Sequence, residues 1–153
     1  MNNQSCSTAD GKKCPIKCLI PLIAAFATLF GFQWVYHGIY MMPDYQATAA
    51  LWRPEADMQN LWWVCIATKL VMAGVICCLY CCMAKSCPSQ GKCVKKGAIF
   101  GFKIGLLLGA ACFASYIWLP ISLNMAIKWL VGDIIMGVLV GVVLALTCRI
   151  CKK

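Results

Sequence analysis

The amino-acid sequence predicts an all-α, polytopic membrane protein, a four-transmembrane-helix bundle with a short interfacial helix in the first outer loop. Three observations support this prediction: the composition, four long apolar runs, and the placement of the basic residues. Of the 153 residues, 62% are hydrophobic and only 12% are charged, whereas soluble domains are roughly 45–50% apolar and about 25% charged. A soluble domain of this length could not bury so much apolar surface, but a bilayer covers it.

Four runs are long enough to cross a membrane, which takes about 20 mainly apolar residues. We predict spans over residues 19–40, 61–83, 98–119 and 123–147. They make one transmembrane domain over 18–148, between basic tails at 1–17 and 149–153. The first run is too long for the apolar core of a signal peptide, and no small-residue cleavage site closes it, so we interpret it as a retained span.

The basic residues predict the orientation of the chain. Ten of those outside the spans fall on one side: Lys12, Lys13, Lys17, Lys85, Lys92, Lys95, Lys96, Arg149, Lys152 and Lys153. The other side has only Arg53. Because cytoplasmic loops are enriched in lysine and arginine, both termini are predicted to be cytoplasmic. The net charge of +9 does not indicate a nucleic-acid partner, because the lysines lie in short clusters between apolar runs.

The first outer loop is the longest connection. Asp44 follows a proline and is predicted to N-cap a short interfacial helix over the alanine-rich residues 46–51. Pro54 suits the first turn of the next helix, with Glu55 and Asp57 near its positive end. The aromatic residues near the outer surface predict an interfacial belt. They are Trp34, Tyr36, Trp52, Trp62, Trp63, Tyr116 and Trp118.

Glycines recur four residues apart in the third and fourth runs. They are Gly97, Gly101, Gly105, Gly109, Gly137 and Gly141. In lipid, close backbone approach through small residues contributes strongly to helix association. The tight turn at Pro120 makes these two spans antiparallel neighbours, so we predict a glycine zipper that packs them together within one chain. A homodimer face is the alternative.

Two opposite charges lie at matched depth inside the predicted spans. Lys69 and Asp133 each lie about nine residues from the outer end of a span, roughly 12–15 Å deep. A lone charge at this depth is costly, so we predict that they pair, with Gln33 and His37 completing a polar cluster. Three interpretations stay open: a structural ion pair, a proton or ion pathway, and a substrate pocket. Lys128 is expected to extend toward the outer surface.

The chain has 13 cysteines, most of them on the predicted cytoplasmic side. A reducing compartment makes a disulfide framework unexpected. Six cysteines at helix-compatible spacing are candidate ligands for a soft metal ion. They are Cys77, Cys78, Cys81, Cys82, Cys148 and Cys151. No C-x-x-C knuckles at a defined separation accompany them, so no cofactor is predicted. Palmitoylation, thiol–disulfide chemistry with a quinone, and a plain packing role are the alternatives.

Several stretches resemble small four-span bacterial inner-membrane proteins of uncharacterised function. They are Tyr45 through Leu51-Trp52-Arg53-Pro54-Glu55, Leu119-Pro120-Ile121, and Trp129 through Asp133 to Gly141. The resemblance implies four helices and no known chemistry. Cysteine-pair mercury transporters are a second comparison, but their pair belongs in the first span, which here has only Cys18 at its entrance.

The function expected from the sequence is therefore that of a small non-enzymatic membrane protein with a structural or interaction role. The expected partners are the lipid bilayer and either a second copy or another membrane protein. A transporter or permeation element for an ion, proton or soft metal is the alternative. A membrane thiol oxidoreductase is the third hypothesis.

Overall fold

The computed structural model describes residues 14–83 and 90–150, and every regular element among them is a helix. Four helices are long and apolar enough to cross a membrane: α1 (Cys14–Val35) with its π-helical extension η1 (Tyr36–Tyr40), α4 (Trp62–Met83), α5 (Gln90–Ala114) and α6 (Leu123–Ile150). The predicted all-α, four-span class is confirmed. The third apolar span, Cys93–Ile117, begins earlier than predicted. The prediction began after Lys95 and Lys96 because these side chains are charged. Both residues are nevertheless helical, since backbone hydrogen bonds define where a helix begins.

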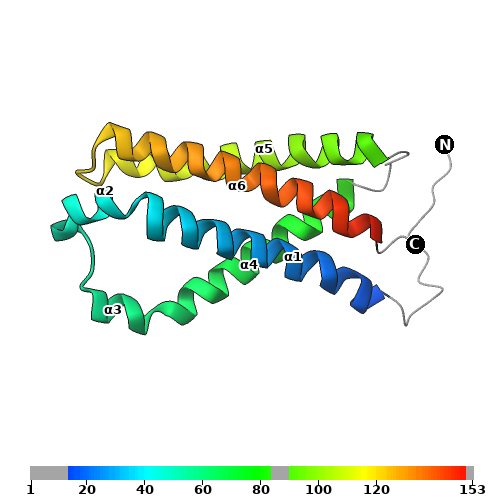
Figure 1. Cartoon of the computed structure of the whole chain (residues 1–153), viewed down its shortest axis with the longest axis horizontal. Helices are drawn as coiled ribbons and strands as arrows, with labels where there is room; N and C mark the ends of the chain where they lie inside the picture. Colours follow the sequence, from blue (N-terminus) through cyan, green and yellow to red (C-terminus); the bar gives the residue numbers. More distant parts are fainter. Residues whose placement is uncertain (1–13, 84–89, 151–153) are drawn as a thin grey trace.

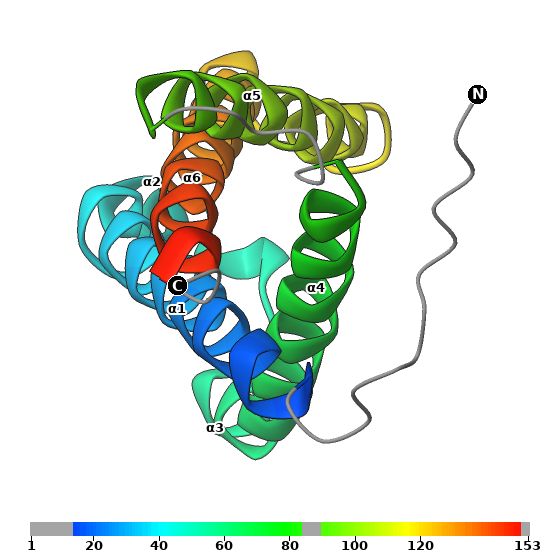
Figure 2. The same ribbon diagram turned by 90° about the vertical axis from the view of Figure 1, so that its right-hand side faces the viewer.

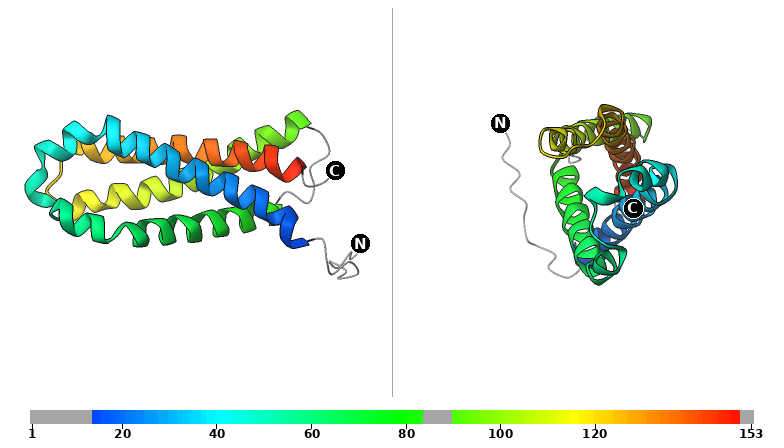
Figure 3. Two further views of the ribbon diagram at one scale, coloured as in Figure 1. Left: turned by 60° about the horizontal axis from the view of Figure 1, so that its bottom comes forward. Right: turned by 90° about the vertical axis from the view of Figure 1, so that its left-hand side faces the viewer.

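The four long helices run up and down in antiparallel pairs (Figure 1). The start of α1 and the end of α6 lie at one end of the bundle, and the short helices between α1 and α4 lie at the opposite end (Figure 3). Viewed along the bundle, α6 lies between α1 and α5 (Figure 2). Helix α4 packs mainly on α1 and touches α5 and α6 little. We call the end with the short helices the loop end.

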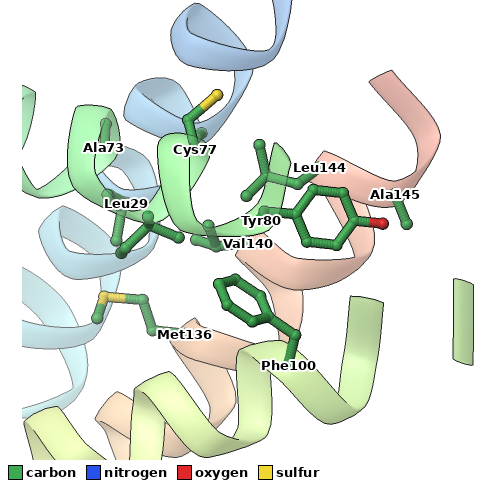
Figure 4. Close-up of a cluster of buried hydrophobic side chains, with 11 residues drawn as sticks. Leu29, Ala73, Cys77, Tyr80, Phe100, Met136, Val140, Leu144 and Ala145 are labelled. Carbon is green, nitrogen blue, oxygen red and sulfur yellow. The ribbon is translucent and has the colours of Figure 1, made fainter. Parts of the chain in front are cut away.

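The main hydrophobic cluster fills the half of the bundle away from the loop end, where all four helices meet (Figure 4). Leu29, Met136 and Leu144 are fully buried there, and Tyr80 packs against Phe100 with ring centroids 5.4 Å apart. Helix α6 is the central element, because 44% of its most apolar stretch is buried, compared with 17–28% in the other spans.

Helices α5 and α6 approach each other backbone to backbone along their glycines. Gly101 faces the carbonyl of Gly137, and Gly97 faces that of Gly141. A Cβ atom at Gly105 would lie only 2.8 Å from the Cα atom of Ile134. Because α6 occupies the glycine face of α5, that face is covered within the chain.

The loop between α1 and α4 contains short helices, as predicted, but their bounds differ from the predicted ones. It contains α2 (Met42–Ala47), the 3-10 turn η2 (Ala49–Leu51) and α3 (Glu55–Asn60). Helix α2 begins before Asp44, because Pro43, with its fixed φ, occupies the first turn. Asp44 is therefore not an N-cap, and the alanine-rich residues 46–51 are divided between the end of α2 and the 3-10 turn. The acidic residues of α3 do lie in its first turn, after Pro54.

The aromatic residues at the loop end separate into two groups. Trp34, Trp63 and Trp118 are 65%, 68% and 79% exposed, as residues of an interfacial belt would be. Tyr36 and Trp52 instead turn inward, where their polar groups form hydrogen bonds. Both side chains are half-buried, and their place in an interfacial belt stays a prediction.

Candidate functional site

Tyr45 of α2 is the centre of a hydrogen-bond network at the loop end. Its hydroxyl accepts a hydrogen bond from the indole N–H of Trp129 at 3.0 Å and lies 2.6 Å from Nδ1 of His37. Burial raises the pKa of Tyr45 to about 12, so the phenol keeps its proton at neutral pH. We therefore assign the Tyr45 O–H as the donor to His37 Nδ1, which leaves the imidazole proton on Nε2. The network joins the outer loop to α1 and α6.

A second set of contacts fixes α2 to the start of α6. Lys128 Nζ lies 2.7 Å from the carboxylate of Asp44 and 5.5 Å from the centre of the Tyr40 ring. The Tyr36 hydroxyl donates to the Lys128 carbonyl oxygen at 2.8 Å, and its ring lies over Gly132, where a Cβ atom would clash. Lys128 was expected to extend toward the surface without a partner. In the structure it forms an ion pair with Asp44.

A cleft of about 210 Å³ lies beneath this network. We call it the Asp133 cleft. Its walls come from α1 with η1, α2, α5 with the following 3-10 turn η4 (Ser115–Ile117), and α6. The lining residues are Gln33, His37, Tyr45, Cys112, Ser115, Trp129 and Asp133. Asp133 is only 8% exposed, and the Cys112 side chain hydrogen-bonds to it.

A second cleft of about 300 Å³ lies between α1 and the half of α4 nearest the loop end. We call it the Lys69 cleft. Its walls include Trp34, Trp62, Cys65 and Lys69, and it shares Gln33 and His37 with the Asp133 cleft. The predicted cluster of Gln33, His37, Lys69 and Asp133 is therefore divided between two adjoining clefts with Gln33 and His37 in both.

Lys69 and Asp133 do not form a direct ion pair. Within residues 14–83 and 90–150, one pair of opposite charges approaches within 4.0 Å, and it is Lys128 with Asp44. The direct pair was predicted from matched depth and opposite charge, and from the helix face that Asp133 shares with Gly137 and Gly141. In the structure α4 makes few contacts with α6. An electrostatic interaction across the shared wall stays a prediction.

The cysteines form no metal centre in the described part of the chain, where no group of three or more metal-binding side chains comes together. Among the six candidates, Cys77 is buried and Cys148 half-buried, whereas Cys78 and Cys82 are exposed. Cys151 lies outside the described residues. Cys93, which is not one of these six, is disulfide-bonded, although no disulfide framework was expected.

Sequence reasoning missed Tyr45, Trp129 and Cys112 as members of the site. Trp129 could have been found, because it lies four residues before Asp133 and therefore on the same helix face. Tyr45 and Cys112 reach the site only through the folding of α2 onto α6 and the packing of α5 against α6, which no local pattern indicates.

Comparison of the chain with models of known protein families, with curated proteins and with solved structures finds no match.

Proposed function

We propose that this chain is a small non-enzymatic membrane protein whose role is to bind another membrane helix through the outer half of α4. One observation supports the proposal: every residue of α4 from Trp62 to Thr68 is exposed, on all faces of the helix. A helix that belongs to a bundle normally buries at least one stripe. The inner half of α4 does so through Ala73, Ile76, Cys77 and Tyr80.

The outer half of α4 therefore offers about two turns of helix to a partner in the bilayer. The surface also adjoins the Lys69 cleft, so a partner helix would find both apolar and polar groups there. Association in lipid depends on such packing and on interhelical hydrogen bonds. The partner is a second copy of the chain or another membrane protein.

Photo-crosslinking from a single position tests the proposal. A photoreactive residue at Ile66, which is 45% exposed, should give protein–protein adducts in native membranes. The matched control is the same residue at Leu107 of α5, which is 67% exposed and should label lipid only. Lipid labelling alone at both positions would contradict the proposal.

We also propose that the protein lies in a bacterial inner membrane with both termini in the cytoplasm. The ten-to-one distribution of basic residues supports this orientation. The loop end, with α2 and α3, would then face the outer side.

The alternative function is permeation of a proton or small ion, which the buried Asp133 favours, since ionisable groups inside spans mark ion pathways. The purified chain in vesicles with an entrapped pH dye would dissipate a proton gradient, and Asp133→Asn would abolish the flux. Asp57→Asn, at an exposed carboxylate of α3, is the control. Flux equal to that of empty vesicles would eliminate this alternative.

A further inference from the structure

From the Asp133 cleft we infer a binding site for a small organic ammonium ion. The inference is independent of the proposed α4 interface, because the two lie on different helices. The cleft is formed by three of the long helices together with α2, whose Tyr45 lines it at the loop end of the bundle. Its polar groups are a carboxylate, an amide, an imidazole, two hydroxyls and a thiol.

The charge of the cleft favours a cation. Asp133 is the only acidic residue in its wall, and no basic side chain of the described residues lies within 4.0 Å of its carboxylate. Lys69 lines the neighbouring cleft, on the far side of Gln33 and His37. A carboxylate nine-tenths buried at membrane depth is costly without a counter-charge, and a bound cation supplies one.

The size and donor set of the cleft argue against a bare metal ion. Its volume of about 210 Å³ equals the liquid volume of roughly seven water molecules. A desolvated metal ion would leave most of this space empty, and the described residues offer no cluster of three metal-binding side chains. The cleft instead matches an organic cation of about seven non-hydrogen atoms.

The remaining wall suits an alkylated ammonium group. Tyr45 and Trp129 contribute aromatic rings, which attract cations and cover methyl or methylene groups. Gln33 and Ser115 provide oxygen acceptors beside Asp133. Lys69 beyond the shared wall adds positive charge, which disfavours a divalent ion and leaves a single positive charge as the best match.

Choline is a suitable probe, because it has seven non-hydrogen atoms and one quaternary ammonium. Its neutral carbon isostere, dimethylbutanol, is the matched control ligand. With the full chain in mild detergent, choline should raise the thermal unfolding midpoint in a saturable manner, and dimethylbutanol should not. Asp133→Asn should weaken choline binding by about tenfold or more, whereas Asp57→Asn should leave it within about twofold.

A readout on the unmodified chain keeps the test decisive if Asp133→Asn does not fold. Cys112 lines the Asp133 cleft and Cys65 lines the Lys69 cleft, and both are exposed. Choline should slow alkylation of Cys112 by N-ethylmaleimide, followed by mass spectrometry, and leave Cys65 unchanged. Equal effects of choline and dimethylbutanol, equal protection of both cysteines, or no protection of Cys112 would each overturn the inference.

Discussion

The hydroxyl oxygen of Tyr45 lies 2.6 Å from Nδ1 of His37, and this contact connects α2 to the π-helical end of the first span. π-Helical turns inside α-helices are rare and occur frequently at functional sites. Here the turn carries Tyr36, His37 and Tyr40, each of which contacts α2 or α6. The helical irregularity and the loop contacts therefore belong to one structural unit above the Asp133 cleft.

Replacing Tyr45 by phenylalanine should destabilise the protein. The change leaves the Trp129 indole N–H and His37 Nδ1 without their shared partner, and an unsatisfied buried polar group costs about 1–3 kcal/mol. The free energy of unfolding in detergent measures the loss. Tyr116→Phe, at an exposed phenol, is the control and should be near neutral. Equal effects of the two substitutions would show that the network contributes nothing.

Alkaline pH should destabilise the folded state through Tyr45. Burial raises the pKa of this phenol from 10.0 to about 12, so folding favours the protonated form. That contribution is complete below pH 10 and is lost as pH rises toward 12. The melting temperature should therefore fall more steeply between these values in the wild type than in Tyr45→Phe. Parallel curves for the two proteins would contradict the assignment.

Glycine at position 105 should be required for the packing of α5 on α6. In Gly105→Ala, the new Cβ would lie 2.5 Å from the Asp133 carbonyl oxygen, so the helices must separate, at an overpacking cost of about 1–3 kcal/mol. Gly74→Ala in α4 has no atom within 4 Å of the new Cβ and should be neutral or stabilising by about 0.5–1 kcal/mol. Unfolding in detergent measures both. A harmless Gly105→Ala would refute the close approach.

Lys69 and Asp133 should show weak energetic coupling. Direct buried pairs lose about 3–5 kcal/mol when one partner is removed, but here Gln33 and His37 lie in the wall shared by the two clefts. We expect a double-mutant cycle with Lys69→Met and Asp133→Asn to give a coupling energy of about 0.5–1 kcal/mol. Strictly additive losses would show that the two charges do not interact.

Reporter fusions test the proposed orientation. Fusions after Lys96 and after Lys153 should read cytoplasmic, and a fusion at Gln46 should read external, because the basic residues concentrate on one side. An external signal from the fusion after Lys153 would overturn the topology. Exchanging the charges at Lys95 and Lys96 for glutamate provides a sensitised background in which the orientation bias should weaken.

The sequence by itself determined the four spans and the neighbours along the chain. Long apolar runs and the short connection at Pro120 are local features of the sequence. In a bilayer such runs form spanning helices, and a short connection makes two of them a hairpin. Glycines four residues apart in α5 and in α6 likewise lie on one face of each helix, independently of the tertiary structure.

Only the tertiary structure decided which polar groups meet. Lys69 and Asp133 were predicted to pair because of their matched depth and opposite charge. Depth does not determine which way each side chain points around its helix axis, or how far α4 lies from α6. Tyr45 reaches His37 and Trp129 because Met41 is buried against α6 and holds α2 there. The contacts of Tyr45 with Trp129 and of Asp44 with Lys128 join residues 84 apart, so no local pattern in the sequence can reveal them.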